Sequence, residues 1–361
     1  MRQPLDYAKK SLDTLIRKFT VEELPPANGF HYHQGVFLRG MEEYYEICGE
    51  EAYFDYIKAW VDLHVTEEGV LEHSNYNQFD DLQPMNLLFR IYEKTGDARY
   101  KKVLDDVMPN YLTWKTNSKG GFWHKGNMQN QMWLDSLYMA GPLGVHYGIF
   151  SGEDRYIDLI MLQLELMWEY MRDARTGLLY HAWDESKQKP WADAKTGLAP
   201  CFWGRAIGWL PVAMVDILDY MPENHPKRPM VIQCLQSLME AVCDYQDAES
   251  GMWYQVINRG IDEENWLESS CSCLFAYGMA KGIRKGYLDR KYADNAWRAY
   301  EGVLKFTREE DNNFFVDNIC IGTGVNNYDG YLARPTSTND LHGVGAFVLM
   351  CCELERLENK N

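Results

Sequence analysis

The chain has 361 residues, of which 46% are hydrophobic and 14% aromatic. It is long enough to bury a large core, and its many rings suit a deep pocket that stacks on flat or cyclic ligands. The formal net charge of −17 argues against nucleic acid or an anionic membrane as the main partner, because basic surfaces bind phosphate groups.

The first segment, residues 1–19, is amphipathic and of mixed charge, and it lacks the continuous apolar stretch of a signal peptide. No part of the sequence reaches the ~18 consecutive apolar residues of a membrane-spanning helix. Nine cysteines, without any Cys-x-x-Cys pair, are typical of free thiols in a reducing compartment. We therefore predict a cytoplasmic protein.

A tyrosine–glycine–tyrosine pattern recurs along the chain at intervals of roughly 50 residues, which predicts that each unit is one supersecondary element stacked on its neighbours. The copies are Tyr45-x-x-x-Gly49-x-x-x-Tyr53, Tyr92-x-x-x-Gly96-x-x-x-Tyr100 and a looser one ending in Gly152-x-x-x-Tyr156.

The repeated units are predicted to be helical hairpins. Apolar residues before Gly96 follow helical spacing, the glycine suits the end of a helix, and Asp97 suits the N-cap of the next one. Six hairpins close into an (α/α)6 barrel, and without a linker this predicts one domain over residues 1–361. The pairs are 36–66, 82–114, 130–172, 204–246, 269–307, and the N-terminal helix with 343–358.

A second recurring element is a glycine followed by apolar and aromatic residues and usually a histidine. It falls between the outer helix of one hairpin and the inner helix of the next. These loops are therefore expected to gather at the mouth of the central cavity, where binding groups concentrate. The copies are Gly69 to His73, Gly121 to His124, Gly177 to His181 and, without the histidine, Gly251 to Tyr254.

Asp135 is the only formally charged residue between Gly126 and Gly152, and apolar and aromatic residues flank it on both sides. A carboxylate in such surroundings needs either a raised pKa or a specific partner. Both outcomes are typical of catalytic acids. The alternative is a core aspartate that caps a helix or pairs with a buried arginine.

Asp80 and Asp81 stand at the start of the inner helix of the preceding hairpin, in a position equivalent to that of Asp135. Two carboxyl groups from adjacent repeats facing one cavity are the usual equipment for glycosidic chemistry. Helix capping is the alternative, with Asp81 the better candidate for a cap and Asp80 for a site residue.

A third cluster combines rings with a cation. Arg205 stands between Trp203 and Trp209, a pattern that suits a carboxylate held by the guanidinium while a ring stacks on a sugar. The alternative is a core tryptophan and an arginine that neutralises an acid. Lys125, His181 and Tyr32 complete the set, and each has a structural alternative. Metal-binding and nucleotide-binding motifs are missing, so we predict no metal and no cofactor.

Five segments, taken in order, resemble the unsaturated rhamnogalacturonyl hydrolases of glycoside hydrolase family 105, which are related to the unsaturated glucuronyl hydrolases of family 88. The resemblance spans essentially the whole chain and implies an (α/α)6 barrel. The segments are His31-Tyr32-His33-Gln34-Gly35, Gly121-Phe122-Trp123-His124-Lys125, Gln131-Met132-Trp133-Leu134-Asp135, Trp203-Gly204-Arg205-Ala206-Ile207-Gly208-Trp209 and Asn339-Asp340-Leu341-His342-Gly343.

The resemblance implies an enzyme that hydrates the C4=C5 double bond of an unsaturated uronic acid at the non-reducing end of lyase-generated oligosaccharides. Asp135 matches the general acid and base, and Asp80 matches the second carboxylate. The matching substrate-pocket positions, with His33 as an alternative to Tyr32, are Tyr32, Lys125, His181, Trp203, Arg205 and Trp209. We further expect burial of Asp135 among apolar residues to keep it protonated.

Two other functions remain open at this point: an inverting glycosidase that acts on saturated glycosides, and a non-catalytic carbohydrate-binding toroid. The expected partner is a small oligosaccharide, and the protein itself is expected to be a monomer or a homodimer. The charged loop from Asp184 to Pro200 is expected at the pocket rim, where it would influence which sugar follows the uronate.

Overall fold

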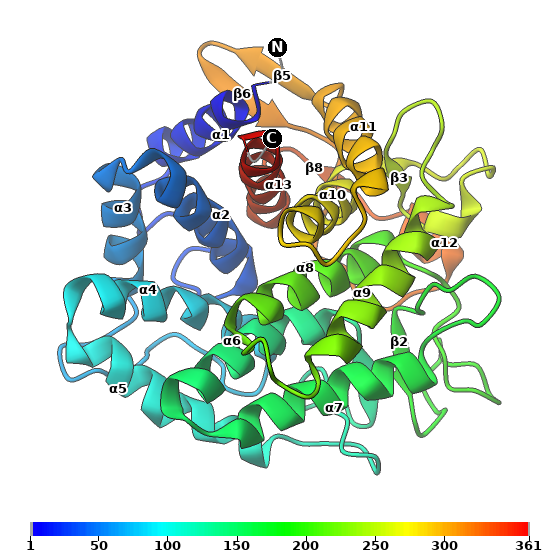
Figure 1. Ribbon diagram of the computed structural model, residues 1–361, viewed down its shortest axis with the longest axis horizontal. Helices are drawn as coiled ribbons and strands as arrows, with labels where there is room; N and C mark the ends of the chain where they lie inside the picture. The colour runs from blue at the N-terminus through cyan, green and yellow to red at the C-terminus, as the bar shows by residue number, and fades with distance from the viewer. Residues whose placement is uncertain (1–2, 360–361) are drawn as a thin grey trace.

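Helices that alternate along the chain differ in how much of their surface is buried. Every residue of α8 (Gly204–Tyr220) up to Leu218 is buried, whereas α9 (Arg228–Cys243) buries one face only. A helix that is apolar all round must be enclosed by other helices, and one with an apolar stripe lies at the outside. The computed structural model, which describes residues 3–359, shows this arrangement as two concentric rings of helices (Figure 1).

The inner ring consists of α2 (Tyr32–Cys48), α4 (Asn86–Thr95), α6 (Asp135–Ser151), α8 (Gly204–Tyr220), α10 (Ser269–Arg284) and α13 (Leu341–Asn359). The outer ring consists of α1 (Pro4–Lys18), α3 (Glu51–Asp62), α5 (Ala98–Val107), α7 (Asp154–Tyr170), α9 (Arg228–Cys243) and α11 (Ala293–Leu304). The ring closes where α13 packs against both α2 and α10, while α1 packs against α13. The six predicted hairpins and the (α/α)6 barrel are confirmed.

Hairpin ends follow the local sequence signals. Gly49, Gly96 and Gly152 end the inner helices α2, α4 and α6 in the left-handed conformation, with φ values of 69°, 70° and 73°. A residue without a side chain adopts this conformation at the lowest cost. Asp97 caps α5 as predicted, since its carboxylate accepts a hydrogen bond from the Arg99 N–H.

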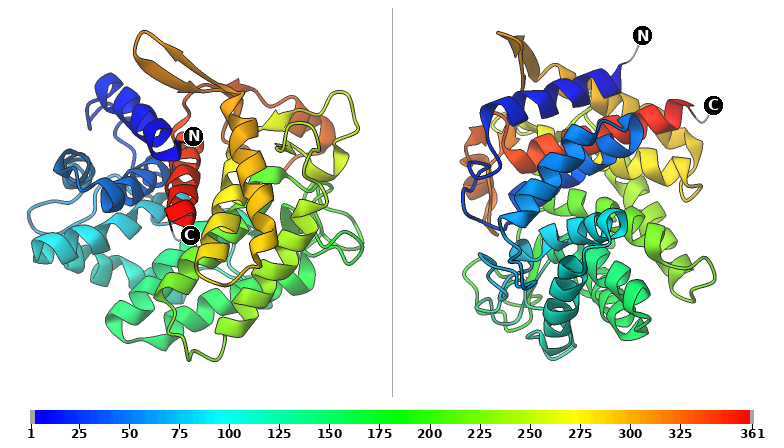
Figure 2. Two further views of the ribbon diagram at one scale, coloured as in Figure 1. Left: turned by 45° about the horizontal axis from the view of Figure 1, so that its top comes forward. Right: turned by 90° about the vertical axis from the view of Figure 1, so that its left-hand side faces the viewer.

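Between the hairpins lie short elements that the helical pattern does not predict. The four antiparallel strand pairs are β1 (Gln131–Trp133) with β2 (Ala182–Asp184), β3 (Trp253–Tyr254) with β4 (Leu267–Glu268), β5 (Thr307–Glu310) with β6 (Asn313–Val316), and β7 (Ile319–Cys320) with β8 (Thr336–Ser337). Short 3₁₀ helices occur at η1 (Phe79–Asp81), η2 (Gln83–Met85), η3 (Met108–Thr113), η4 (Ile257–Arg259) and η5 (Arg290–Tyr292), and the α-helix α12 (Tyr328–Leu332) is also short. The side view in Figure 2 shows the longer loops collected at one end of the ring.

Charged side chains from the middle and C-terminal parts of the inner helices pair at the opposite end of the ring. Arg39 pairs with Glu42 at 2.6 Å and with Glu43 at 2.5 Å, and Lys281 pairs with Asp216 at 2.5 Å. Buried ions of this kind persist only when paired. Arg39, Glu42 and Glu43 line a cavity of about 430 Å³ at that end, in which the charges of opposite sign already neutralise one another.

No helix within residues 3–359 is long and apolar enough to cross a membrane. All nine cysteines are free thiols, as predicted.

Close packing between α2 and α13 leads to a stability prediction. A Cβ atom added to Gly345 would lie 2.4 Å from the carbonyl oxygen of Val36, in the backbone of the facing helix. We expect Gly345→Ala to lower the free energy of unfolding by about 2 kcal/mol, the usual range for overpacking, as measured by urea denaturation. Gly324→Ala serves as the control, because its Cβ makes only an ordinary 3.5 Å contact. Equal stability of the two variants would contradict the prediction.

Candidate active site

A cavity of about 280 Å³ lies at the loop end of the ring, where several inner helices begin. Carboxylates, imidazoles, an ammonium group and aromatic rings share its wall, a mixture that suits a polar cyclic ligand. The lining residues are His31, Tyr32, His33, Asp80, His124, Lys125, Met128, Trp133, Asp135, Met139, Gly322, Thr323 and Gly324.

Asp135 is placed at the cavity wall by a strand pair and a helix start. β1 pairs with β2 so that Trp133 faces Ala182, and the Leu134 N–H donates to the carbonyl of His181 at 3.0 Å. Asp135 then opens α6. The strand pair therefore brings the side chains of Asp135 and His181 together, although 46 positions separate them in the sequence.

His181 lies behind Asp135 and does not line the cavity. Its side chain is 0% exposed, and its Nε2 atom is 3.2 Å from Oδ2 of Asp135. This is an ion-pair distance, although the angle is poor for a hydrogen bond. Its Nδ1 atom is 2.6 Å from the hydroxyl of Tyr331. The position is that of a residue that orients the carboxylate, whereas the resemblance implied a substrate contact.

The pKa of Asp135 differs from the expectation. Burial raises it, but the imidazoles of His181 and His124 outweigh burial and hold the pKa below its usual range. The prediction that burial keeps this acid protonated was wrong, because the neighbouring imidazoles outweigh burial. The other outcome foreseen for an isolated carboxylate, a specific partner, is the one observed.

Asp80 and Lys125 form an ion pair across the cavity wall. Lys125 Nζ is 2.7 Å from Oδ2 of Asp80, because a β-bridge joins Gln78 to Lys125. Burial raises the pKa of Asp80, but His124 and Lys125 outweigh it and the pKa is lowered. The lysine is thus a cation at the cavity, already balanced by one carboxylate.

Asp81 does not cap the following helix. Its Oδ2 atom accepts hydrogen bonds from the Asn75 N–H at 3.1 Å and from the Gln78 side chain at 2.6 Å. It therefore ties down the preceding loop, which in turn fixes η1 and Asp80. The prediction that Asp81 caps a helix was wrong. Asp80 lines the cavity and Asp81 does not, in agreement with the choice of Asp80 as the better candidate for a site residue.

Tyr32 and His33 both line the cavity at the start of α2, so the two alternatives raised by the sequence coexist. The ring of Tyr32 is edge-on to that of Trp209, with centroids 6.4 Å apart, and burial raises its pKa well above the usual range. Burial also lowers the pKa of the neighbouring His31 to about 4. His31 is therefore neutral at physiological pH.

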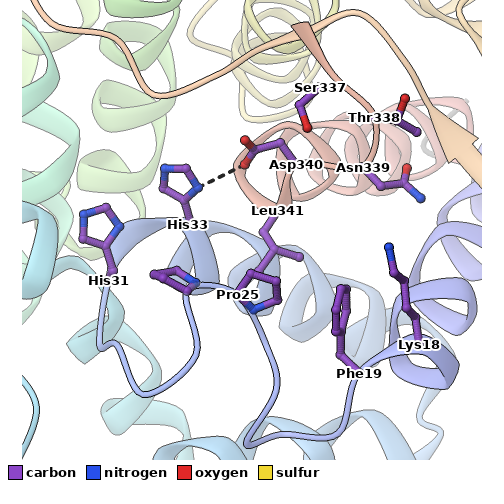
Figure 3. Close-up of a pocket in the computed structure, with 11 residues that line it drawn as sticks. Lys18, Phe19, Pro25, His31, His33, Ser337, Thr338, Asn339, Asp340 and Leu341 are labelled. Carbon is purple, nitrogen blue, oxygen red and sulfur yellow. Dashed lines mark ion pairs between the residues drawn. The ribbon is translucent and has the colours of Figure 1, made fainter. Parts of the chain in front are cut away.

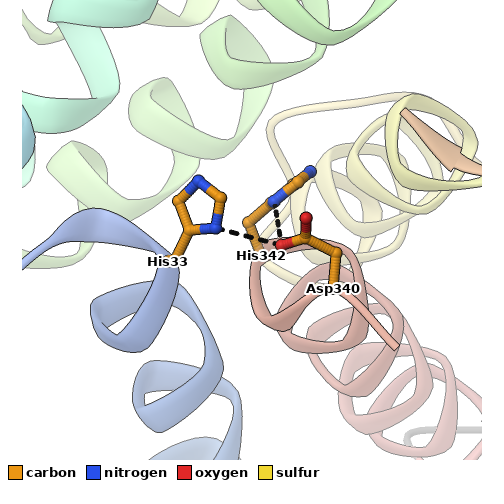
Figure 4. A group of neighbouring side chains, drawn as sticks. All are labelled: His33, Asp340 and His342. Carbon is orange, nitrogen blue, oxygen red and sulfur yellow. Dashed lines mark hydrogen bonds and ion pairs between the residues drawn. The ribbon is translucent and has the colours of Figure 1, made fainter. Parts of the chain in front are cut away.

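One carboxylate oxygen joins two histidines next to this wall (Figure 4). Oδ1 of Asp340 is 3.0 Å from Nδ1 of His33 and 2.8 Å from Nδ1 of His342. The three groups lie within 4.8 Å of one another and are of types that bind transition metals. The contacts among them already occupy both Nδ1 atoms, so the arrangement works as a hydrogen-bonded brace that fixes the ring of His33.

Trp203, Arg205 and Trp209 are not among the residues that line the cavity, and the substrate contacts that the resemblance implied for them stay a prediction. Each is 1% exposed. Trp203 donates to the Gln255 side chain at 3.1 Å, and Trp209 stacks on Tyr138 with centroids 4.7 Å apart. The two tryptophans lie behind the site, where Trp209 contacts Tyr32 and Trp203 contacts His181.

The side chain of Arg205 forms hydrogen bonds with backbone carbonyl groups of the protein and does not reach the cavity. Its guanidinium donates to the carbonyls of Cys320 at 2.5 Å and Ile321 at 2.7 Å. The buried carboxylate of Glu268 accepts from the Cys320 N–H at 2.9 Å. One peptide segment is thereby clamped between opposite charges, and it leads directly into the Gly322–Gly324 wall of the cavity.

Several lining residues were not singled out as site residues from the sequence. Trp133 and His124 stack with centroids 4.3 Å apart and offer the aromatic face that had been assigned to Trp203 and Trp209. His124 was recognisable as part of a repeated segment. Gly322 to Gly324 carried no such signal. The loop from Asp184 to Pro200 contributes none of the described lining.

A double ring of helices with two carboxylates in a cavity at one end defines the chain as a glycosidase of the α/α type. It belongs to Glycosyl Hydrolase Family 88, whose family model matches residues 7–358.

Related proteins agree with this assignment. A glycoside hydrolase from family 105 of Clostridium acetobutylicum is 32% identical, with a TM-score of 0.91, covering 97% of this chain and 99% of that one. An unsaturated rhamnogalacturonyl hydrolase of Bacillus subtilis is 28% identical over 83% of this chain and 82% of its own length. An unsaturated 3S-rhamnoglycuronyl hydrolase of Alteromonas is 24% identical over 66% of this chain and 54% of its own length.

Proposed function

We propose that this glycosidase removes a C4=C5 unsaturated uronic acid from the non-reducing end of oligosaccharides produced by polysaccharide lyases. Unsaturated galacturonyl–rhamnose from rhamnogalacturonan is the favoured substrate. The observation that carries the proposal is a cavity with a carboxylate backed by an imidazole, Asp135 with His181, near an ion pair of Asp80 with Lys125. Membership of the family and the names of the relatives support it.

The proposed reaction is hydration of a vinyl ether. The Asp135 carboxyl donates its proton to C4 of the unsaturated ring, and the cation that develops at C5 is stabilised by the ring oxygen. Water adds to C5 and gives a proton back to the Asp135 carboxylate. The product is a hemiketal, which opens and releases the remaining sugar. Asp135 thus acts first as a general acid and then as a general base.

Other lining residues fit the binding of the ring. The flat unsaturated ring is expected to stack on Trp133, which reaches the cavity and is itself backed by His124. The uronate carboxylate is expected to accept hydrogen bonds from Lys125, drawing it partly away from Asp80. The uronate carboxylate is a further anion beside Asp80 and Asp135, so its binding is expected to raise the pKa of Asp135 and favour the protonated acid.

The proposal is tested by the ultraviolet absorbance of the C4=C5 double bond. Lyase digests of pectin, ulvan and glycosaminoglycans are incubated with the protein, and loss of absorbance is expected for at least one unsaturated disaccharide. Turnover of saturated glycosides alone would instead identify an ordinary inverting glycosidase. Tight binding of an unsaturated disaccharide without loss of absorbance would identify a carbohydrate-binding protein.

The lowered pKa of Asp135 gives a pH prediction. A step that needs the protonated carboxyl slows as pH rises above this pKa, because the protonated fraction falls about tenfold per pH unit. We expect kcat/KM to decline between about pH 5.5 and pH 8, since it reports the free enzyme. The decline of kcat should begin at higher pH, because bound uronate raises the pKa. A kcat/KM that increases over this interval would contradict protonation of Asp135 as the requirement.

We also propose that the chain acts as one catalytic domain in the cytoplasm, as a monomer or a homodimer. The nine free thiols suit a reducing compartment, and the family model extends over nearly the whole sequence. Cell fractionation tests the location, and recovery of the protein from the culture medium would overturn the cytoplasmic assignment. Light scattering tests the oligomeric state.

A further inference from the structure

A second cavity, of about 430 Å³, adjoins the candidate active site. Both cavities are lined by His31 and His33, so these two imidazoles form the wall between them. The remaining lining comes from the end of α1, the segment that follows it, and the residues just before and at the start of α13 (Figure 3). A ligand bound at Asp135 therefore has a neighbouring space on the far side of the histidines.

The walls of this second cavity have a consistent chemical character. Phe19, Pro25, Pro26 and Leu341 give it an apolar side, which suits the C–H face of a sugar ring. The hydroxyl of Ser337 faces them across the cavity in Figure 3 and has no hydrogen-bond partner within residues 3–359.

Lys18 is the cation of the second cavity, and Figure 3 places it at the end away from the histidines. Its Nζ atom lies 4.9 Å from the centroid of the Phe19 ring, and no carboxylate pairs with it in the described part of the chain. The lysines earlier on the same helix differ, because Lys9 pairs with Glu50 at 3.1 Å and Lys10 with Glu309 at 2.5 Å.

The one carboxylate in the cavity wall is already engaged. Asp340 contacts His33 and His342, and these partners hold its pKa well below the usual range. In a chain with a net charge of −17, an unpaired lysine at the end of a cavity is an available site for an external anion.

We infer that the second cavity binds the part of the oligosaccharide beyond the scissile bond, and that Lys18 pairs with an anionic group on it. The inference rests on the proposed function. The anion is either a sulfate ester on the second sugar or the carboxylate of a third sugar, and both present oxygens to the same ammonium group. Lys18 is thus a specificity-determining residue for the leaving part of the substrate.

The experiment compares three unsaturated substrates by loss of absorbance. Unsaturated galacturonyl–rhamnose carries no anion beyond the scissile bond, the rhamnogalacturonan tetrasaccharide carries a carboxylate on its third sugar, and unsaturated glucuronyl–rhamnose 3-sulfate carries a sulfate on its second. The variants are Lys18→Ala and Lys18→Glu. Lys291→Glu is the matched control, because its Nζ lies 5.0 Å from the Tyr292 ring centroid in the α10–α11 connection, at the other end of the ring.

We expect Lys18→Ala to lower kcat/KM about threefold and Lys18→Glu about tenfold for a substrate with an anion at the right place, effects typical of an exposed ion pair. Kinetics on the neutral disaccharide should stay within about twofold of wild type. The losses should shrink as salt is added. Whichever of the tetrasaccharide and the sulfated disaccharide responds identifies the source of the anion.

The outcomes separate the two proposals. Wild-type protein that turns over none of the three substrates overturns the proposed function and this inference with it. Wild-type turnover with equal or no effect of Lys18→Glu across the three substrates overturns the inference alone. An equal loss in Lys291→Glu also overturns it, since that result assigns the effect to net charge.

Discussion

Asp135→Asn is expected to lower kcat on an unsaturated disaccharide by about 10³-fold, within the range for loss of a general acid. The amide has nearly the shape of the carboxyl group but neither donates a proton to C4 nor accepts one from water. Binding should survive, because the cavity wall and Lys125 are unchanged. Absorbance assays give the rate, and calorimetry with the same disaccharide gives the affinity.

Asp154→Asn is the matched control, because Asp154 opens α7 as Asp135 opens α6 but lies exposed on an outer helix. It should retain wild-type kinetics. Circular dichroism and the Tm verify that both variants keep the fold. Full activity of Asp135→Asn would show that Asp135 is not the general acid and would make Asp80 the candidate for that role.

Arg205→Met is expected to destabilise the protein by about 3–5 kcal/mol, the usual cost of removing one partner from a buried set of charges. The substitution leaves the Cys320 and Ile321 carbonyls without their donor and Glu268 without its nearby cation. Because the clamped segment continues into the Gly322–Gly324 wall, KM should rise as well. Denaturant unfolding and substrate kinetics measure the two effects.

Arg259→Met provides the comparison, since Arg259 is exposed and pairs with Asp262 at 2.5 Å on the surface. The free energy of unfolding of the Arg259→Met variant should differ from that of wild type by less than about 1 kcal/mol. If Arg205→Met instead kept wild-type stability and weakened only substrate binding, Arg205 would be a direct ligand of the uronate, as the resemblance implied.

The repeat pattern was sufficient to predict the ring, because each hairpin carries its own periodicity and stop signals. Gly96 and Asp97 illustrate this, since a helix end and a cap depend on neighbours within a few residues. The interhelical strands were missed for the opposite reason. β1 and β2 are three residues each, too short for an alternating pattern to be recognised.

The candidate site was predictable in part. An isolated acid among apolar residues drew attention to Asp135, and equivalence in the repeat drew attention to Asp80. The pairing of Asp135 with His181 depends on a strand register that no local pattern encodes. Arg205 was assigned to a ligand because it stands between two tryptophans and matches a substrate-pocket position, but neither signal shows which anion or carbonyl a buried cation binds. The direction in which the pKa of Asp135 is shifted depends on that same long-range pairing.

The closure of the ring by α13 has a consequence for biosynthesis. α13 packs against α2 and α10, so these two inner helices, which precede it in the chain, meet their last partner only after residues 341–359 have been made. Until then the apolar sides of α2 and α10 face a gap in the wall. A chain of this topology is therefore expected to stay open until α13 is made, and its demand for chaperones should be greatest in that interval. Truncations within α13 are therefore expected to yield aggregates, even though every residue that lines the candidate active site, from His31 to Gly324, precedes α13.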